Sequence, residues 1–380
     1  MPTIQSTDIF ATAPNGSKSP DSITSGDGSI WVQYGNGAKS DGSGGSSTVV
    51  QYDLLGNTQN TYTVAGSDDG LKVDPATGNV WVLQNQDGNS TLTFIDPKTN
   101  QASAPLSYAS LYIYGADSTR GYDDVAFVGQ KVFESYTNPV NPGDAVIQQL
   151  ANGTAPFGSL QTTDVLRFGD TGTNLVTGET NQPLPLADPD SLKSMPDGSL
   201  ILTSGSENSF TIVANPGTTQ QSASFVTLPK SAGSLDDVVM PTASSGTFYV
   251  SNQNDNNILA VKVDGLNTHD LYASVGAAVD QVDPTTGAVT PIITGLNASH
   301  GLLFVPAASG APDLAALFQT LSQDLAQAFA NLGVSASQAG AFGAAGTVPG
   351  ASAPSAASLI SLISADTSGA LAGLLPVVKG

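Results

Sequence analysis

The chain has 380 residues, and 32 acidic side chains against 11 basic ones give it a formal net charge of −21. A surface of this charge repels phosphate and carries no basic patch, so nucleic acid is not an expected partner. Cysteine is absent, which excludes disulfides, thiolate catalysis and cysteine-type zinc sites. No run of about 18 apolar residues is present, so no membrane span is expected.

One short pattern recurs six times along the chain. An acidic residue, once replaced by histidine, is followed by a small or acidic residue and then by an aliphatic residue. The copies begin at Asp21, Asp69, Asp123, Asp190, Asp236 and His300. A repeat of roughly 45–65 residues that contains only strand-like segments is typical of a β-propeller.

Further strand-like runs follow each copy, separated by Asp-Gly and Pro-Asp-Gly turns that favour hairpins. We expect second strands at 29–34, 79–83, 131–136, 200–202 and 248–250, and third strands at 48–53, 91–96, 164–168, 210–213 and 258–263. Fourth strands close the units, for example at 60–64 and 224–228. Four strands make one blade, whose first strand lines the central channel and whose fourth forms the rim. Trp31 and Trp81 occupy matching positions, which favours core packing over ligand stacking.

Two units are longer than the others, with insertions at 138–161 and near 264–283. Insertions of this kind on a propeller often carry function. The strand pattern ends after Val305, so a sixth blade must take strands from the first 20 residues or from the hairpin at 264–283. We predict an all-β, six-bladed propeller, with five blades as the alternative.

The composition changes near residue 309. Apolar residues from 314 to 332 fall on one helical face, an Ala/Gly/Ser-rich tract follows, and the end of the chain is apolar. We therefore predict a propeller at 1–308 and an appendage at 309–380, formed by a helix and a flexible apolar tail. The tail would dock onto the propeller, mediate self-association, or act as an export signal.

Localisation follows from the same features. The N-terminus lacks the basic and apolar regions of a signal peptide. The strong acidity, the absence of cysteine and the nearly uncharged tail favour an extracellular protein exported without a signal peptide. A cytoplasmic protein is the alternative.

The repeat predicts a site at the mouth of the channel, where the innermost strands begin. The side chains that would meet there are Asp21, Asp69, Asp123, Asp190, Asp236 and His300. Carboxylates at close range cannot all ionise without a counter-ion. Converging aspartate oxygens suit a hard divalent cation, Ca²⁺ above others, and His300 would add a ligand or a general base. The doubled acids at 68–69, 123–124 and 236–237 support such a site. In the alternative, each aspartate caps the N–H groups of a neighbouring loop.

Several segments of the repeats resemble those of known propeller families. The segments 20–23 with 28–32, and 189–192 with 197–200, resemble units of the regucalcin/gluconolactonase superfamily, and 282–287 and 299–302 resemble NHL- and YVTN-type repeats. The resemblance implies a six-bladed propeller. It also implies a metal-binding aspartate at the strand start, beside a glutamate and an asparagine, and Asp21 and Asp190 match that position. No glutamate near the N-terminus matches the glutamate of the superfamily, which favours binding over lactonase activity.

Three functions follow from this sequence. The first is a binding protein whose acidic channel site holds a divalent metal or a small polar ligand. The second is a metal-dependent hydrolase of lactone or ester type, with His300 or Asp236 as the base. The third is an extracellular interaction module whose long loops contact a partner.

Overall fold

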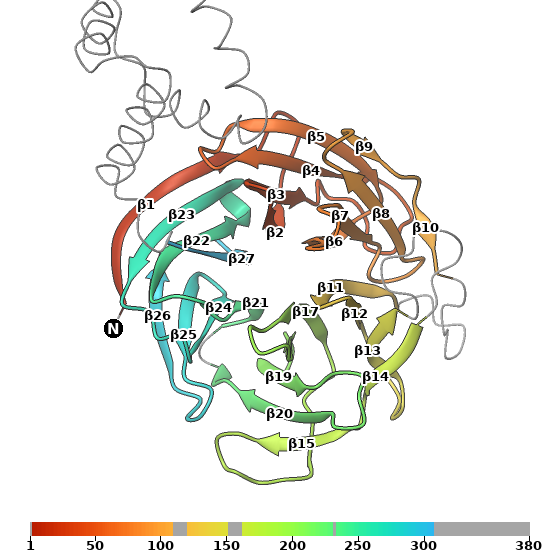
Figure 1. Ribbon diagram of the computed structural model, residues 1–380, viewed down its shortest axis with the longest axis vertical. Coiled ribbons are helices and arrows are strands. Elements are labelled where there is room, and N and C mark those ends of the chain that lie inside the picture. Colours follow the sequence, from red (N-terminus) through yellow and green to blue (C-terminus); the bar gives the residue numbers. More distant parts are fainter. Residues whose placement is uncertain (1, 109–119, 151–161, 231–232, 308–380) are drawn as a thin grey trace, which may run out of the picture. The chain divides into compact units, whose positions relative to one another are not determined.

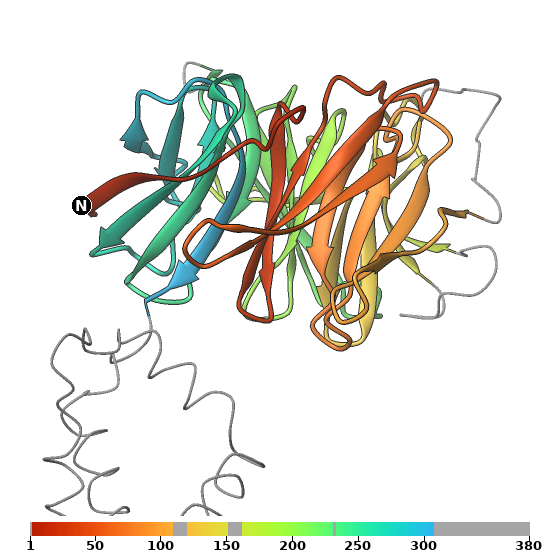
Figure 2. The same ribbon diagram turned by 90° about the horizontal axis from the view of Figure 1, so that it is seen from above.

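The computed structural model describes residues 2–108, 120–150, 162–230 and 233–307. These residues form six β-sheets arranged as blades around a central channel (Figure 1). Seen edge-on, the strands of each blade run between the two faces of the ring (Figure 2). A short 3-10 turn, η2 (Gln253–Asp255), follows strand β22. The prediction of an all-β, six-bladed propeller is confirmed.

The first three blades follow the repeat in chain order. Blade one contains β2 (Pro20–Gly26), β3 (Ser29–Tyr34), β4 (Ser46–Asp53) and β5 (Thr58–Ala65). Blade two contains β6 (Asp68–Val73), β7 (Val80–Gln84), β8 (Thr91–Asp96), β9 (Gln101–Ala102) and β10 (Leu106–Ser107). Blade three contains β11 (Tyr122–Val128), β12 (Lys131–Tyr136), β13 (Ala145–Leu150) and β14 (Thr162–Arg167). The predicted third strand at 164–168 is therefore the fourth, because β13 lies inside the predicted insertion.

The last three blades depart further from chain order. Blade four contains β17 (Pro189–Ser194), β18 (Leu200–Ser204), β19 (Ser209–Ala214) and β20 (Ser222–Thr227), extended by β15 (Thr171–Asn174) and β16 (Gln182–Pro183). Blade five contains β21 (Leu235–Val239), β24 (Leu271–Val275), β25 (Ala278–Val282) and β26 (Val289–Thr294). Blade six contains β27 (Ser299–Pro306), β22 (Ser245–Asn252), β23 (Asn257–Asp264) and β1 (Thr3–Thr12).

The hairpin β22–β23 belongs to a different blade from the one the sequence predicts. We expected 248–250 and 258–263 to continue blade five after β21. Instead β22 pairs with β27 in blade six, and the chain then returns to blade five with β24. The segment near 264–283, expected as an extra hairpin, thus supplies regular strands of blade five. A β-rich hairpin satisfies its backbone hydrogen bonds equally well in either blade, so the local pattern does not decide between them.

The ring is closed by the N-terminal strand, one of the two sources that the sequence left open. Strand β1 pairs antiparallel with β23 and forms the outer edge of blade six. Phe10 on β1 contacts rings of two blades, with centroids 5.9 Å from Tyr52 of blade one and 4.9 Å from Tyr249 of blade six. Both contacts are edge-to-face, a favourable geometry for aromatic pairs.

Apolar side chains fill the spaces between neighbouring blades. Trp31 and Trp81 are both 2% exposed, so the prediction that they pack in the core is confirmed. Near the axis the innermost strands approach closely. A Cβ atom on Gly70 or Gly301 would clash with the backbone of the next strand, at Asp123 and at Asp21 respectively. Glycine at these two repeat positions therefore lets the ring close tightly around the channel.

The predicted appendage at 309–380, with its helix and apolar tail, lies outside the described residues. Among the residues that the structure describes, no helix is long and apolar enough to span a membrane.

Candidate functional site

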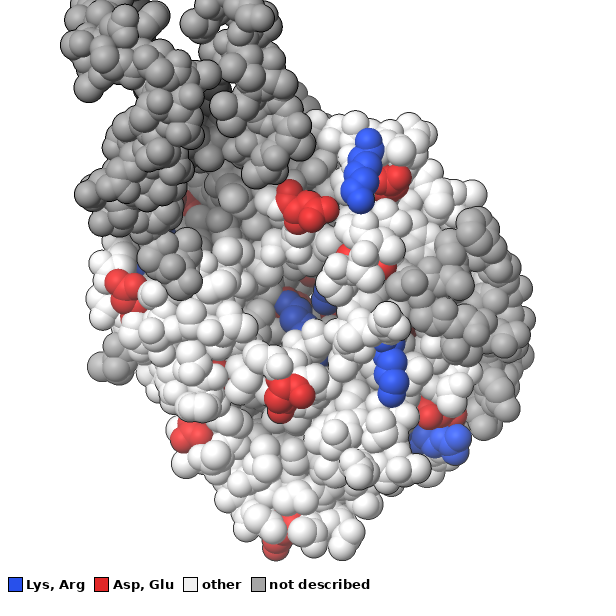
Figure 3. Space-filling view, in the orientation of Figure 1, with Lys and Arg blue, Asp and Glu red and all other residues white. Residues whose placement is uncertain are grey.

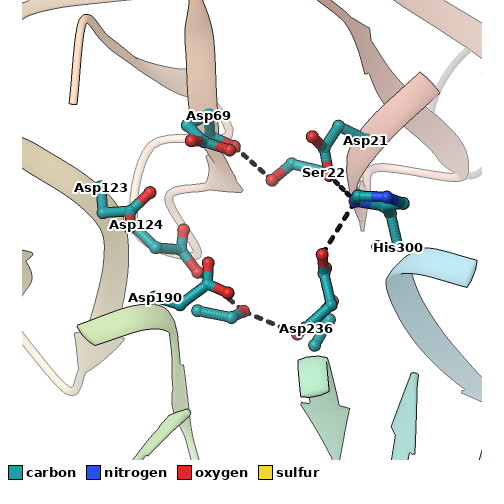
Figure 4. A pocket seen from close by; sticks show the side chains of 11 residues that line it. Asp21, Ser22, Asp69, Asp123, Asp124, Asp190, Asp236 and His300 are labelled. Carbon is teal, nitrogen blue, oxygen red and sulfur yellow. Dashed lines mark hydrogen bonds and ion pairs between the residues drawn. The ribbon is translucent and has the colours of Figure 1, made fainter. Parts of the chain in front are cut away.

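The six repeated side chains meet in one cavity at the start of the innermost strands. The cavity has a volume of about 210 Å³. Figure 4 shows the side chains of the six blades arranged around a common space. The lining residues that the repeat predicted are Asp21, Asp69, Asp123, Asp190, Asp236 and His300. The structure thus brings every predicted site residue together.

One half of the cavity is organised by His300. Its Nδ1 lies 2.8 Å from an oxygen of Asp236 and 3.5 Å from an oxygen of Asp21. Burial alone would lower the pKa of His300, but the two hydrogen bonds to carboxylates outweigh it and raise the pKa to about 11. Burial also raises the pKa of Asp236 to about 6, although the hydrogen bond from His300 acts in the opposite direction. The imidazole is therefore a cation held between two carboxyl groups at neutral pH.

The other half contains three carboxyl groups and no basic side chain. Burial raises the pKa values of Asp69, Asp123 and Asp190 well above the usual range, and the neighbouring carboxylates raise them further. The carboxyl groups of Asp69 and Asp123 share a hydrogen bond, which lowers the pKa of Asp69 and raises that of Asp123. Carboxyl groups at this range cannot all ionise without a counter-ion, and a proton shared between Asp69 and Asp123 would relieve part of the repulsion.

Three of the lining residues could hold a metal ion. One carboxylate oxygen of Asp21, one of Asp236 and a ring nitrogen of His300 all lie within 4.8 Å of one another. Two carboxylates and one imidazole form a donor set that binds divalent cations. Asp69, Asp123 and Asp190 line the same cavity but lie outside this group of three.

The second acids of two doubled pairs have a different role. Asp124 follows Asp123, and both of its oxygens accept hydrogen bonds from Lys72 Nζ, at 2.9 and 2.8 Å. Asp237 follows Asp236 and lies 2.5 Å from Lys193 Nζ. Burial would raise the pKa of Asp237, but Lys193 and Lys72 more than offset it and hold the pKa below the usual range. These two aspartates are thus neutralised by lysines of the protein.

The remaining doubled acid, Asp68, does not line the cavity, whereas Asp124 and Asp237 do. Its side chain is only 3% exposed, and neither carboxyl oxygen has a hydrogen-bond partner among the described residues. Burial, and the neighbouring Asp69, raise its pKa well above the usual range. Burial therefore favours the neutral form of Asp68.

The lysines beneath the ring were not singled out from the sequence. Lys72 and Lys193 each follow a ring aspartate by three residues, Asp69 and Asp190. Both ammonium groups are in ion pairs that are mostly shielded from solvent, with lysine side chains 15% exposed. A basic residue at the same offset in two repeats is the signal that would have identified them.

Comparison with known proteins bears on the fold. No protein-family model matches the sequence, and no curated protein matches it. Among solved structures, the chain is similar to a catalytically inactive variant of virginiamycin B lyase from Staphylococcus aureus, crystallised with quinupristin. The two chains are 15% identical with a TM-score of 0.43, and the match covers 79% of this chain and 81% of the lyase. It is also similar to a periplasmic gluconolactonase from Pseudomonas aeruginosa at 12% identity and a TM-score of 0.46, over 76% and 89% of the two chains. The structural neighbours of this chain thus include propellers of gluconolactonase and virginiamycin B lyase type.

Proposed function

We propose that this propeller binds a divalent cation at the acidic mouth of its central channel. The observation that carries the proposal is the convergence of five aspartates and one histidine on a single cavity of about 210 Å³. Lys72 and Lys193, the nearest lysines, already pair with Asp124 and Asp237. A cation in the mouth would therefore replace protons as the counter-charge of the ring.

Asp21, Asp236 and His300 are the proposed ligands. Binding at these three residues requires that the Nδ1 proton of His300 leaves, because that proton occupies the space between the carboxylates. We propose Ca²⁺ as the ion, since carboxylate oxygens dominate the lining and Ca²⁺ prefers oxygen ligands. Mn²⁺ and Zn²⁺ accept an imidazole more readily and are the competing ions, and a small polar ligand bound by the carboxylates is the competing ligand class.

Calorimetric titration of the EDTA-treated full chain with CaCl₂, MnCl₂ and ZnCl₂ tests this site. The double variant Asp21→Asn/Asp236→Asn should bind the preferred ion at least tenfold more weakly. Asp8→Asn, which removes an exposed charge from β1, is the matched control and should bind like the unmodified chain. Equal affinities of the double variant and the control, or no binding of any ion, would show that the proposal is wrong.

A hydrolase of lactone or ester type is the second candidate, favoured by the contact of 2.8 Å between His300 and Asp236 within the proposed metal group. A metal there would polarise a carbonyl group and activate water. Asp236 or His300 would act as the general base, and the residue that does so would leave the metal to the other two groups. A panel of lactones and esters, assayed with and without EDTA, tests this candidate. Turnover that survives in Asp236→Asn would eliminate Asp236 as the base.

We further propose an extracellular location, from the acidic composition and the absence of cysteine, and a role of the long propeller loops in contacting a partner. The appendage at 309–380 would be the export signal or a surface for self-association. Deletion of residues 311–380 tests whether the appendage is needed for export. A deletion variant that is still secreted but melts several degrees lower would show that the appendage is structural.

A further inference from the structure

The opposite end of the channel has a different character from the acidic mouth. The blades run clockwise from one to six in Figure 1 and counter-clockwise in Figure 4, so the two views look at opposite faces. Figure 3, in the orientation of Figure 1, shows basic side chains at the bottom of the central hollow. A cavity of about 160 Å³ opens there, and Lys72 and Lys193 are the charged residues in its lining. We call it the lysine pocket.

The ammonium groups of the lysine pocket retain hydrogen-bonding capacity. Lys193 Nζ donates to Asp237 Oδ2 at 2.5 Å and to the carbonyl of Leu302 at 2.6 Å. Lys72 Nζ donates to the two oxygens of Asp124. An ammonium group has three donors. The bonds found among the described residues therefore leave one donor on each lysine.

The remaining walls of the lysine pocket are mainly apolar. They include Met195, Ile201, Met240 and Phe304. A neighbouring cavity of about 230 Å³ shares Lys72 and Lys193 and is walled by Val73, Pro75, Ala126 and Phe127, among other residues. Two ammonium groups thus stand at the junction of two largely apolar spaces. A ligand that fits this arrangement has an anionic head and a short hydrocarbon part.

We propose that the lysine pocket binds a small carboxylate anion with a short apolar tail. The carboxylate would accept the remaining donors of Lys72 and Lys193 in a charge-assisted pair of hydrogen bonds, and the tail would lie against the apolar walls. An inorganic anion such as phosphate lacks the apolar part and should bind more weakly. This site uses other residues than the proposed cation site and does not depend on it.

The two ends of the channel should influence each other. The acidic ring lies on the other side of the Lys–Asp layer and repels an anion through a poorly hydrated interior. Neutralising ring charge should therefore strengthen carboxylate binding.

The test uses the full chain with ¹⁵N-labelled lysine, titrated with sodium butanoate at constant ionic strength. NMR signals of the Lys72 and Lys193 ammonium groups should shift and saturate, while those of exposed Lys262 should not. Neutral butanamide, matched in size and shape, should cause no such shift. If neither buried ammonium group responds to butanoate, or if butanamide acts equally, the proposal is overturned.

Two variants provide an independent measurement by calorimetry. Lys72→Met should bind butanoate at least tenfold more weakly, with Lys262→Met as the matched control. Because Lys72→Met leaves Asp124 without its ion pair and could unfold, Thr242→Phe is the second variant. Thr242 is an exposed residue of the pocket lining, so a larger side chain should obstruct the pocket without disturbing the core. Unchanged affinity in Thr242→Phe would contradict the assigned location.

Discussion

Asp237 on blade five accepts a hydrogen bond of 2.6 Å from the backbone N–H of Leu302 on blade six. Asp124 on blade three makes the equivalent bond, 2.9 Å long, to the N–H of Leu192 on blade four. The residue before each of these aspartates lines the same acidic cavity as they do. Adjacent acids in the same repeat nevertheless differ in role, because the second acid pairs with a lysine and accepts a hydrogen bond from the backbone of the next blade.

This difference predicts that two neighbouring substitutions lower the free energy of unfolding by different amounts. Asp237→Asn leaves the buried ammonium of Lys193 unpaired and should lower the free energy of unfolding by about 3 kcal/mol. Asp236→Asn loses the contact with His300 but relieves repulsion from the other ring carboxylates, and because these two effects partly cancel it should cost only about 1 kcal/mol. Urea denaturation at neutral pH in the presence of EDTA measures both values. Equal losses in the two variants would contradict the assignment.

Glu134 predicts a pH dependence of stability that is separate from the channel. It lies on β12 with no exposed surface, accepts a hydrogen bond of 2.6 Å from Tyr108, and its second oxygen has no partner among the described residues. Burial raises its pKa from 4.5 to about 8. The folded state therefore binds more protons than the unfolded state between these two pH values. The contribution of Glu134 to stability is complete below pH 4.5 and is lost as the pH rises to about 8.

The size of this loss follows from the shift. It amounts to roughly 3–5 kcal/mol at 1.36 kcal/mol per pKa unit. Glu134→Gln, which keeps the shape and the hydrogen bond from Tyr108, should flatten the profile over this range. Denaturation midpoints at pH 5, 6, 7 and 8 provide the measurement. A variant whose profile has the same slope as that of the unmodified chain would exclude Glu134 as the source.

His300 should remain charged far above the usual range of histidine. Its pKa of about 11 means that the contribution of its ion pairs to stability is present below pH 6.5 and is lost only as the pH rises through 11. NMR of the imidazole in a His269→Asn background, which leaves one histidine, follows this titration in the EDTA-treated protein. Replacement of both partners, in Asp21→Asn/Asp236→Asn, should shift the midpoint to lower pH. A midpoint near 6.5 in the unmodified site would contradict the geometry.

Closure of the ring predicts a further pair of substitutions. Phe10→Ala removes contacts with both Tyr52 and Tyr249 and should cost about 2–3 kcal/mol of unfolding free energy, because the side chain is only partly buried. Its neighbour Ile9 is 61% exposed, so Ile9→Ala should cost less than about 0.5 kcal/mol. Chemical denaturation compares the two variants. Equal losses of unfolding free energy in the two variants would show that Phe10 does not stabilise the closure of the ring.

The innermost strands could be predicted because each copy of the repeat keeps its acid, or His300 in the sixth copy, together with its aliphatic residue. The same copies predicted six of the side chains that line the cavity, since equivalent strand starts meet at one axis. The position of the hairpin β22–β23 in blade six could not be predicted, because the residues of a strand do not specify which neighbouring strand it pairs with. The pairing of Asp124 with Lys72, and of Asp237 with Lys193, depends on contacts between blades. A repeat pattern within one chain segment does not contain such contacts.

The exchanged hairpin and the closing strand have a consequence for how the chain is made. Strand β1 leaves the ribosome first, but its partner β23 ends only at Asp264. At a synthesis rate of about 5–20 residues per second, β1 remains without its partner for on the order of tens of seconds. Blade five is likewise interrupted until blade six has begun. Blades five and six are therefore completed together, and until then strand β1 is an unpaired edge strand that other chains can contact.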